Sequence, residues 1–417
     1  MQHSPDGDDA YLSPTEKMRL WRALPAARRV LSYDRDIRII AAAKRVFEWW
    51  TESSTFRKSF CRQELESEIG VLAPEAYPLA GTAIGNSFGL EIEPDLRTAF
   101  LEHLTYLSSP KIIGDQGINC EAFQRWRKAK RELCLASATE EARRALSMVP
   151  FAFELGDGCS VGCYFCSVSA GGLKGHYVAS KENLATFREI LLVCQSLVGD
   201  ALEHCPMYWA TDPFDNPDYE EFAEVFCKVT GSHPPFCSAL GTKNLHRTRQ
   251  YLSSQHSRSL GRVRLSILSR KHLKLLYSEF SPTDLLSVDV APVGRSSRLP
   301  KVVSGRFRTL FLRNANVQAT ELSSRQIIRG GDHGLLRAFE HWTLGESNSC
   351  LLGYRINFLN GKVSLCSPIQ ASEEFLNGEV IHASTLLEVG QDLSRELKRM
   401  IEIDSPFERL TGQGQRW

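Results

Sequence analysis

GDGCSVGCYFCSVSA, residues 156–170, holds three of the chain's 12 cysteines, Cys159, Cys163 and Cys166, in the spacing C-x3-C-x2-C. A structural zinc site takes four ligands, usually as two closely spaced pairs, and no second pair follows at a suitable distance. Three thiolates in a glycine-containing loop suit instead a 4Fe-4S cluster in which one iron has no protein ligand. The sequence therefore favours such a cluster. A zinc site and three structural cysteines are the alternatives.

The composition is that of an ordinary globular protein of 417 residues, with 42% hydrophobic residues, 24% charged residues and a net charge of +1. This balance gives no global electrostatic reason to bind nucleic acid or a membrane. The first residues, MQHSPDGDDAYLSP, are acidic and polar where a secretory signal would be basic and then apolar. No apolar run reaches membrane-spanning length, and the cysteines are too scattered for a disulfide framework. We therefore expect a cytoplasmic protein without nucleic-acid or membrane partners.

Residues 1–147 are expected to form an α-helical N-terminal region. The run from Ser13 to Glu16 offers an N-cap, a proline at the first helical position and a glutamate for a capping box. Apolar residues then recur with helical period through IRIIAAAKRVFEWW and again through LRTAFLEHLTYL. Both runs predict helices with one apolar face.

From Pro150 the pattern changes to short apolar runs that alternate with helix-like segments. Alternation of this kind predicts βα units and a parallel sheet or barrel over residues 148–345. The segment at 294–306, GRSSRLPKVVSGR, carries four basic residues and is expected to be either a solvated surface loop or a contact for an acidic part of the substrate. The candidate strands are FAFEL, MYWA, FCSAL, VRLSILS and LLSVDVA, and the candidate helices are KENLATFREILLVCQSLV and YEEFAEVFCKV.

Residues 346–417 are expected to form a β-hairpin and a helical tail that complete the active site. The run SCLLGYRINFLNGKVSLCSP places two extended stretches around Asn360 and Gly361, a strong short-range signal for a hairpin. With a two-residue turn, Arg355 pairs across from Cys366. The tail is expected near SRELKRMIEI.

The cysteine triplet resembles the cluster loop of the radical SAM superfamily, which follows the first barrel strand and has an aromatic residue before the third cysteine. Here FAFEL precedes the triplet and Phe165 precedes Cys166. The resemblance implies a partial (βα)6 barrel whose three cysteines hold the 4Fe-4S cluster. It also implies S-adenosylmethionine on the open iron, and its cleavage to a 5′-deoxyadenosyl radical that takes a hydrogen atom from the substrate.

The resemblance also implies where the S-adenosylmethionine site lies. Ala210, Thr211 and Asp212 stand, before a proline, where superfamily members usually have a glycine-glycine-glutamate-proline run. Backbone carbonyls and the acid there would hold the methionine ammonium, although both glycines are absent from this chain. Taken alone, the same residues describe only a strand end that runs into a capped helix.

Further residues of the cofactor site are assigned by the same resemblance. Ser266 and Ser269 lie in VRLSILSR, on a strand where the superfamily places polar ligands for ribose or carboxylate. Asp289 in SVDVAP is a similar candidate, and Phe165 is assigned to the cofactor site beside the third cysteine. A serine on a strand is as often a small packing residue, and that alternative stays open.

A closer resemblance is to the radical SAM peptide epimerases that modify proteusin-type precursor peptides. The segments that carry it span most of 150–380, and FEWWTESSTFRKSF supports it from the N-terminal region. It implies a ribosomal precursor peptide, leader plus core, as partner, and a reductase or a flavodoxin or ferredoxin as electron donor. The matching segments are FELGDGCSVGCYFCSVSA, YWATDPFDNPDYEEF, VRLSILS, FSPTDLL and SCLLGYRINF followed by SPIQAS.

Members of that family are understood to remove a Cα hydrogen inside the peptide and to return hydrogen to the opposite face from a cysteine thiol. A Cα radical is near planar, so the face that meets the donor fixes the product. The family has a cysteine directly after serine-proline, where this chain has Ile369. Cys366 is the favoured donor and Cys350 the alternative. Without a donor, the same radical would give a cross-link, a thioether or another product that is not an epimer.

A hypothesis from another class makes the N-terminal helices a binding module and the barrel an inactive remnant. The intact triplet speaks against it, since a remnant has no use for three thiolates around an open iron. Trp49 and Trp50 are expected in a helical core, with a groove for the leader peptide as the functional alternative. Only Cys350 and Cys366 follow Cys237, so a single cluster is predicted.

Overall fold

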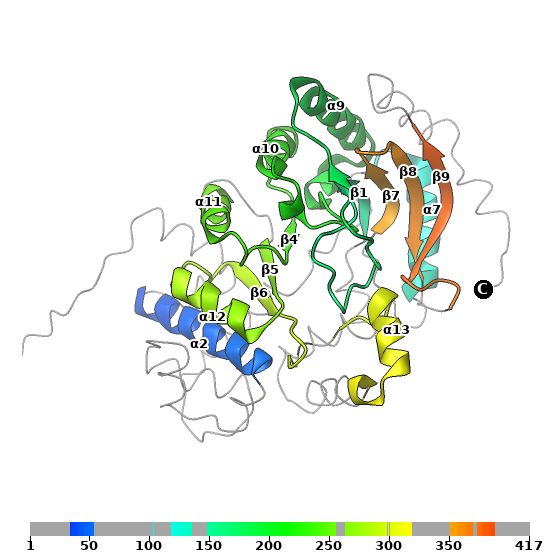
Figure 1. The fold of residues 1–417 in the computed structure, drawn as a ribbon. Helices are drawn as coiled ribbons and strands as arrows, with labels where there is room; N and C mark the ends of the chain where they lie inside the picture. The colour runs from blue at the N-terminus through cyan, green and yellow to red at the C-terminus, as the bar shows by residue number, and fades with distance from the viewer. Residues whose placement is uncertain are drawn as a thin grey trace, which may run out of the picture.

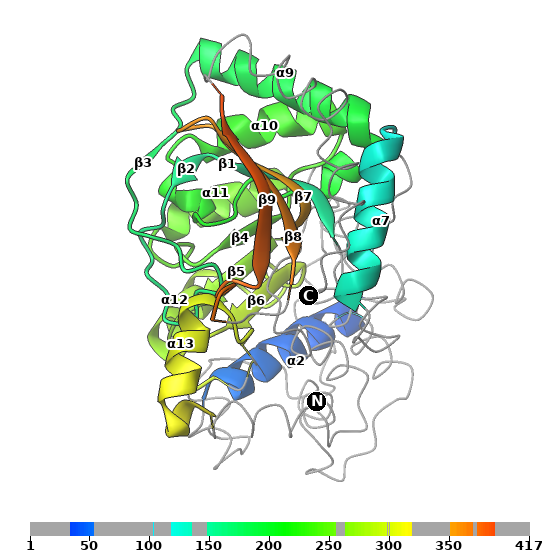
Figure 2. The ribbon, with the colours of Figure 1, turned by 90° about the vertical axis from the view of Figure 1, so that its right-hand side faces the viewer.

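The computed structural model describes residues 34–53, 103, 118–135, 148–255, 263–297, 299, 301–318, 351–369 and 373–387. These residues form a mixed α/β fold in which helices flank open sheets (Figures 1 and 2). The predicted α/β class is therefore confirmed. No sheet within these ranges closes into a barrel, so the partial (βα)6 barrel stays an expectation.

The helices follow the apolar periodicity of the sequence wherever they are described. The run around IRIIAAAKRVFEWW forms α2 (Asp34–Glu52). Helix α9 (Lys181–Val198) begins after Ser180, whose hydroxyl accepts a hydrogen bond from the N–H of Asn183 at 3.1 Å. The others are α7 (Glu121–Leu135), α10 (Tyr219–Thr230), α11 (Leu245–Gln255), α12 (Arg270–Glu279) and α13 (Gly305–Arg313), with short 3₁₀ turns η2 (Gly199–His204) and η3 (Pro213–Asp215).

Three expected helical features lie outside the described residues. These are the capped start at Ser13, the run LRTAFLEHLTYL apart from residue 103, and the tail near SRELKRMIEI. Trp49 is fully buried, and its ring lies 6.4 Å from that of Tyr277 on α12. The helical-core interpretation of Trp49 is therefore confirmed. None of the helices that the structure describes is long and apolar enough to cross a bilayer.

A three-stranded parallel sheet has the order β4-β5-β6. β4 (Phe236–Ser238), β5 (Val263–Ile267) and β6 (Val288–Pro292) confirm the predictions for FCSAL, VRLSILS and LLSVDVA. Residues of β5 alternate between buried and half-buried, as expected for a strand with two unlike faces. Helices α2 and α12 lie beside this sheet (Figure 1).

A second sheet has the order β1-β7-β8-β9. Its first pair is parallel and the remaining pairs are antiparallel. Helix α7 covers one face, where Phe123 lies 5.8 Å from Tyr354. In Figures 1 and 2, α13 and the loop after β1 lie on the other side of the sheet. The strands are β1 (Val149–Glu154), β7 (Leu351–Asn357), β8 (Lys362–Pro368) and β9 (Glu379–Leu386).

The predicted strand over MYWA is wrong, since residues 207–210 form bends. One backbone hydrogen bond does join this segment to β1, from the N–H of Phe153 to the carbonyl of Pro206 at 2.9 Å. The N–H of Ala210, however, donates to the side chain of Glu154 instead of a strand carbonyl. The chain then turns at once into η3. Side-chain hydrogen bonding thus replaces the strand pairing that the apolar run predicts.

The predicted hairpin is confirmed, but its register is wrong. Gly353 pairs with Cys366, and Arg355 pairs with Ser364. The turn begins early because the side chain of Asn357 accepts hydrogen bonds from two backbone N–H groups that follow it. It therefore contains more than the Asn-Gly pair. The longer turn shifts Cys366 two positions along β7 from the expected partner.

Candidate functional site

The cysteine triplet lies on a loop whose ends are joined by a short antiparallel pair, β2 (Gly156–Asp157) and β3 (Gly175–His176). The loop turns at Gly158, which has φ +83°. A Cβ at this position would lie 2.1 Å from the carbonyl oxygen of Gly172. Only glycine fits such an approach, so the backbone closes the loop before any ligand is bound.

The three thiols are half-buried and take part in no disulfide. The N–H of Val161 donates to Cys159 Sγ at 3.5 Å, and the N–H of Ala170 donates to Cys166 Sγ at 3.3 Å. Burial raises the pKa of Cys159 to about 11. Burial, and then the charges of its two neighbours, raise the pKa of Cys163 to about 12. The three sulfurs therefore lie near enough to repel one another when ionised.

The donor set fits an iron-sulfur cluster in its chemistry. Among the described residues, no group of three or more His, Cys, Asp or Glu side chains is already arranged to hold a metal ion. Thiolates are nevertheless the ligands of such clusters, and N–H to sulfur hydrogen bonds of the kind seen at Cys159 and Cys166 tune them. A cationic centre would also relieve the mutual repulsion that disfavours ionised thiols.

Arg306 on α13 holds this loop at three carbonyl groups. Its guanidinium donates to the oxygens of Cys163 at 2.8 Å and Ala170 at 2.7 Å, and its own N–H donates to the oxygen of Cys166 at 2.8 Å. Arg306 closes the basic segment 294–306, for which a solvated loop or a substrate contact was expected. Its side chain supports the cysteine loop instead. The four basic residues were the available signal, but sequence reasoning missed this role.

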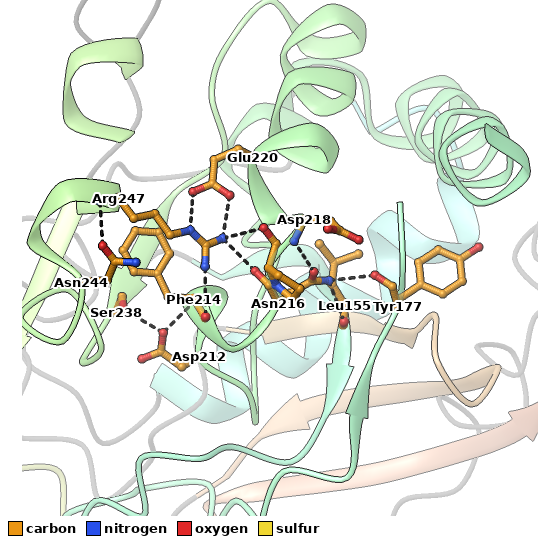
Figure 3. Close-up of polar contacts among 11 residues, drawn as sticks. Leu155, Tyr177, Asp212, Phe214, Asn216, Asp218, Glu220, Ser238, Asn244 and Arg247 are labelled. Atoms are coloured by element: carbon orange, nitrogen blue, oxygen red, sulfur yellow. Dashed lines mark hydrogen bonds and ion pairs between the residues drawn. The ribbon is translucent and has the colours of Figure 1, made fainter. Parts of the chain in front are cut away.

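The loop is also held from the segment 210–220, here called the anchor segment. Asn216 is buried, and its side-chain amide donates to the carbonyls of Leu155 at 3.1 Å and Tyr177 at 2.9 Å (Figure 3). These two residues flank the cysteine loop on either side. One amide group therefore fixes both ends of the loop.

Two acids of the anchor segment accept hydrogen bonds from the same region. Asp215 Oδ2 accepts from the N–H of Ser160 at 2.9 Å, directly after the first cysteine. Asp218 Oδ2 accepts from the N–H of Ala179 at 2.9 Å, just before α9. The distinctive run DPFDNPDY thus positions the backbone of the cysteine loop.

Arg247 on α11 contacts the anchor segment and fixes its position (Figure 3). Its guanidinium forms two hydrogen bonds with the carboxylate of Glu220, at 2.7 and 2.6 Å. It donates further to the carbonyls of Phe214 and Asn216 and lies 4.4 Å from the centre of the Phe214 ring. A bidentate pair with additional carbonyl acceptors is a rigid arrangement.

Asp212 is buried and already has three hydrogen-bond donors. Its carboxylate accepts from the hydroxyl of Ser238 at 2.7 Å and from the N–H groups of Ala239 at 2.7 Å and Phe214 at 3.0 Å. Burial raises its pKa to about 6, against the lowering effect of these donors. The resemblance assigns Asp212 to the methionine ammonium. In the structure it caps η3 and joins the anchor segment to β4.

Thr211 and Asp212 lie close to the residues at the two ends of the cysteine loop. They line a small cleft in which residues before and after the triplet face the anchor segment. Ala210 contributes its N–H to Glu154 Oε1 at 2.9 Å, and Phe165 packs edge-on against Tyr164 at 5.2 Å. The lining residues are Leu155, Gly156, Leu173, His176, Met207, Thr211, Asp212, Pro213, Asp215, Asn216 and Tyr219.

Three further candidates for the cofactor site, Ser266, Ser269 and Asp289, have partners within the protein. Ser269 is the N-cap of α12, and its hydroxyl accepts from the N–H of the third helical residue at 3.3 Å. Ser266 Oγ lies 3.7 Å from Cys237 Sγ. Asp289 forms an ion pair with Arg264 at 2.6 Å across β5 and β6. Each side chain thus has a structural use that the sequence does not reveal.

Cys366 lies on β8, fully buried, and burial raises the pKa of its thiol. Tyr354 on β7 faces α7, so its neighbour Gly353 and the residue paired with Gly353, Cys366, lie on the opposite face of the second sheet. The turn that follows β8 accepts a hydrogen bond at Leu376 from the N–H of Gly305, beside Arg306. The end of β8 therefore adjoins the support of the cysteine loop. Cys350, the alternative donor, lies outside the described residues.

Comparison with known proteins identifies a relative of this chain, but it does not assign an activity. No family model matches the chain, and no solved structure matches it significantly. The chain is 28% identical over 358 residues to an uncharacterized protein, y4wI, of Sinorhizobium fredii (strain NBRC 101917 / NGR234). The match covers 78% of this chain and 66% of that protein.

Proposed function

We propose that this chain is a radical SAM enzyme that binds one 4Fe-4S cluster through Cys159, Cys163 and Cys166. The observation that carries the proposal is the loop itself, with three half-buried thiols directly after β1 and backbone supports from Arg306 and the anchor segment. A structural role for the three thiols would not require the N–H donors to sulfur at Cys159 and Cys166. With S-adenosylmethionine, the cluster would supply a 5′-deoxyadenosyl radical.

The proposed reaction is the conversion of L- to D-residues in a ribosomally made precursor peptide. The substrate loses a Cα hydrogen and takes one back from the thiol of Cys366, which keeps its proton because the pKa of the thiol is raised by burial. The position of Cys366 near the turn that contacts α13 supports its role as donor. A flavodoxin, a ferredoxin or a reductase would return the electron that the thiol loses.

The cluster is tested by reconstituting the purified chain with iron and sulfide and measuring iron content and S-adenosylmethionine cleavage. We expect Cys163→Ala to lower both by more than about tenfold, because a ligand is lost. Cys227→Ala, a change on α10, is the matched control and should keep both. Unaltered cleavage by the Cys163 variant would contradict the proposal.

The epimerisation is tested in deuterated water with a precursor peptide encoded beside the enzyme. We expect a gain of one mass unit per modified residue, with deuterium at Cα, because the thiol hydrogen exchanges with solvent. Cys366→Ala should cleave S-adenosylmethionine and yet form no D-residue. A loss of two mass units or a fragment would replace epimerisation by a cross-linking or cleaving reaction, and full D-residue formation by the variant would favour Cys350.

A further inference from the structure

The thiol of Cys366 lies in a buried cluster of ionisable side chains from four neighbouring strands. Glu154 comes from β1, Arg355 from β7, Cys366 from β8 and Glu379 from β9. Arg355 Nη1 lies 3.2 Å from Glu379 Oε2, and Arg355 Nε lies 3.9 Å from Glu154 Oε2. The side chains of Glu154 and Glu379 are 8% and 7% exposed. One arginine thus lies between two buried carboxyl groups.

Glu379 is the member of the cluster that adjoins the thiol. Glu379 pairs with Pro368 and Cys366 pairs with Ile381, so both side chains lie on the same face of the β8-β9 pair, and the charge of Glu379 raises the pKa of the Cys366 thiol. Glu379 Oε1 has no nitrogen or oxygen partner in the part of the chain that the structure describes, whereas Oε2 accepts from Arg355. The thiol itself donates to the carbonyl of Ser364 at 3.6 Å. A proton on Oε1 would therefore find the sulfur as its acceptor.

The charges around Glu379 favour a carboxyl group that holds and releases a proton. Burial raises the pKa of Glu379, and the nearby Glu154 raises it further, while Arg355 and the Cys366 thiol lower it. A buried acid can act as a proton donor when its proton faces a reactive atom and a cation contacts its other oxygen.

We propose that Glu379 supplies the proton that restores the Cys366 thiol after each hydrogen transfer, an inference that rests on the proposed function. Donation of a hydrogen atom leaves a thiyl radical on Cys366. One electron from a flavodoxin- or ferredoxin-type donor and the proton of Glu379 convert it to the thiol. Glu379 is left as a carboxylate, stabilised by Arg355, and takes a proton back from solvent.

The test compares the wild-type holoenzyme with Glu379→Gln, which keeps the size of the side chain and an acceptor for Arg355 but has no acidic proton. We expect the first D-residue per enzyme to form at the wild-type rate and later turnovers to slow more than about tenfold, the scale of a lost proton transfer. Glu379→Asp should restore part of the later rate. Repeated turnover by Glu379→Gln at the wild-type rate would overturn the inference.

A second measurement needs neither cluster nor substrate. In the protein without cofactors, at a pH high enough to ionise Glu379, Cys366 of Glu379→Gln should react with a small methanethiosulfonate about tenfold faster than in wild type, because a negative charge that disfavours the thiolate is gone. Cys205, also buried, is the control and should react as in wild type. Unchanged Cys366 reactivity would show that Glu379 does not act on the thiol. A wild-type enzyme that forms no D-residue, with Cys366 reactivity shifted as expected, would instead place the failure in the proposed function.

Discussion

The anchor segment and the cluster around Cys366 both contain acidic side chains that are buried or partly buried, but they use them differently. In the anchor segment, the carboxylates of Asp212, Asp215 and Asp218 each accept a hydrogen bond from a backbone N–H. On β9, Glu379 has one oxygen on Arg355 and the other without such a donor. Buried polar groups are normally paired, so an acid with a spare oxygen beside a thiol calls for a functional reason.

This difference indicates which acids position the site and which take part in chemistry. An acid whose oxygens are occupied by backbone donors fixes the chain, and its loss is felt as instability or a displaced loop. An acid that keeps a free oxygen next to a reactive atom can pass a proton to that atom.

Gly158→Ala should abolish cluster binding, because its Cβ would meet the carbonyl oxygen of Gly172 at 2.1 Å and the loop could not close. Gly162→Ala is the matched control, since Gly162 also has a positive φ, +64°, but its Cβ would meet nothing within 4 Å. We expect iron per chain to fall more than about tenfold in the first variant and less than about twofold in the second, where only a backbone strain of about 1–2 kcal/mol arises. Equal iron content in the two variants would show that loop closure is not required.

Arg247→Ala should lower the free energy of unfolding by about 3–4 kcal/mol, because it leaves Glu220 and two carbonyls of the anchor segment without their donor. Arg249→Ala, on the same helix, removes an exposed pair with Glu279 and should cost about 0–1 kcal/mol. Urea unfolding of both variants measures the difference. Similar losses would mean that the anchor segment is not held from α11.

Much of the fold could be predicted from the sequence, because it depends on local periodicity. The apolar repeats predicted α2, α9 and α10, and the cysteine spacing located the loop after β1. The MYWA strand could not be predicted correctly, since the outcome depends on a side chain of β1 that takes its N–H. The hairpin register failed for a similar reason, through the side chain of Asn357.

The residues that hold the candidate site in place could not be predicted from sequence patterns. Arg306 and Cys163 are 143 positions apart, and nothing local marks the arginine that will meet the loop. The same holds for Glu379, whose contact with Cys366 depends on the register between β8 and β9. Sequence motifs named the groups that carry chemistry, while the residues that hold them appear only once distant segments meet.

Asp212→Asn should change the dependence of stability on pH. Burial raises the pKa of Asp212 from 3.8 to about 6, so its contribution to stability is present below pH 4 and is lost as the pH rises through 6. We expect a loss of about 2–3 kcal/mol over this range, on the scale of about 1.4 kcal/mol per pKa unit, that the variant lacks. Unfolding followed at several pH values gives the difference between the two proteins. A parallel pH dependence would mean that burial does not raise the pKa of Asp212.

Ser269→Ala should have the smallest effect, a fall of about 1 kcal/mol in the free energy of unfolding, because α12 loses its N-cap. Ser269→Asp keeps a capping oxygen and should restore most of this loss. If the hydroxyl is fully used by the N–H of His272, neither change will alter the affinity of the reconstituted protein for S-adenosylmethionine. Weaker cofactor binding by Ser269→Ala at unchanged stability would show that a satisfied cap can also serve the site. The distinction between positioning and reacting groups would then not hold for Ser269. A single hydrogen bond within the protein would not suffice to exclude a polar side chain from the chemistry.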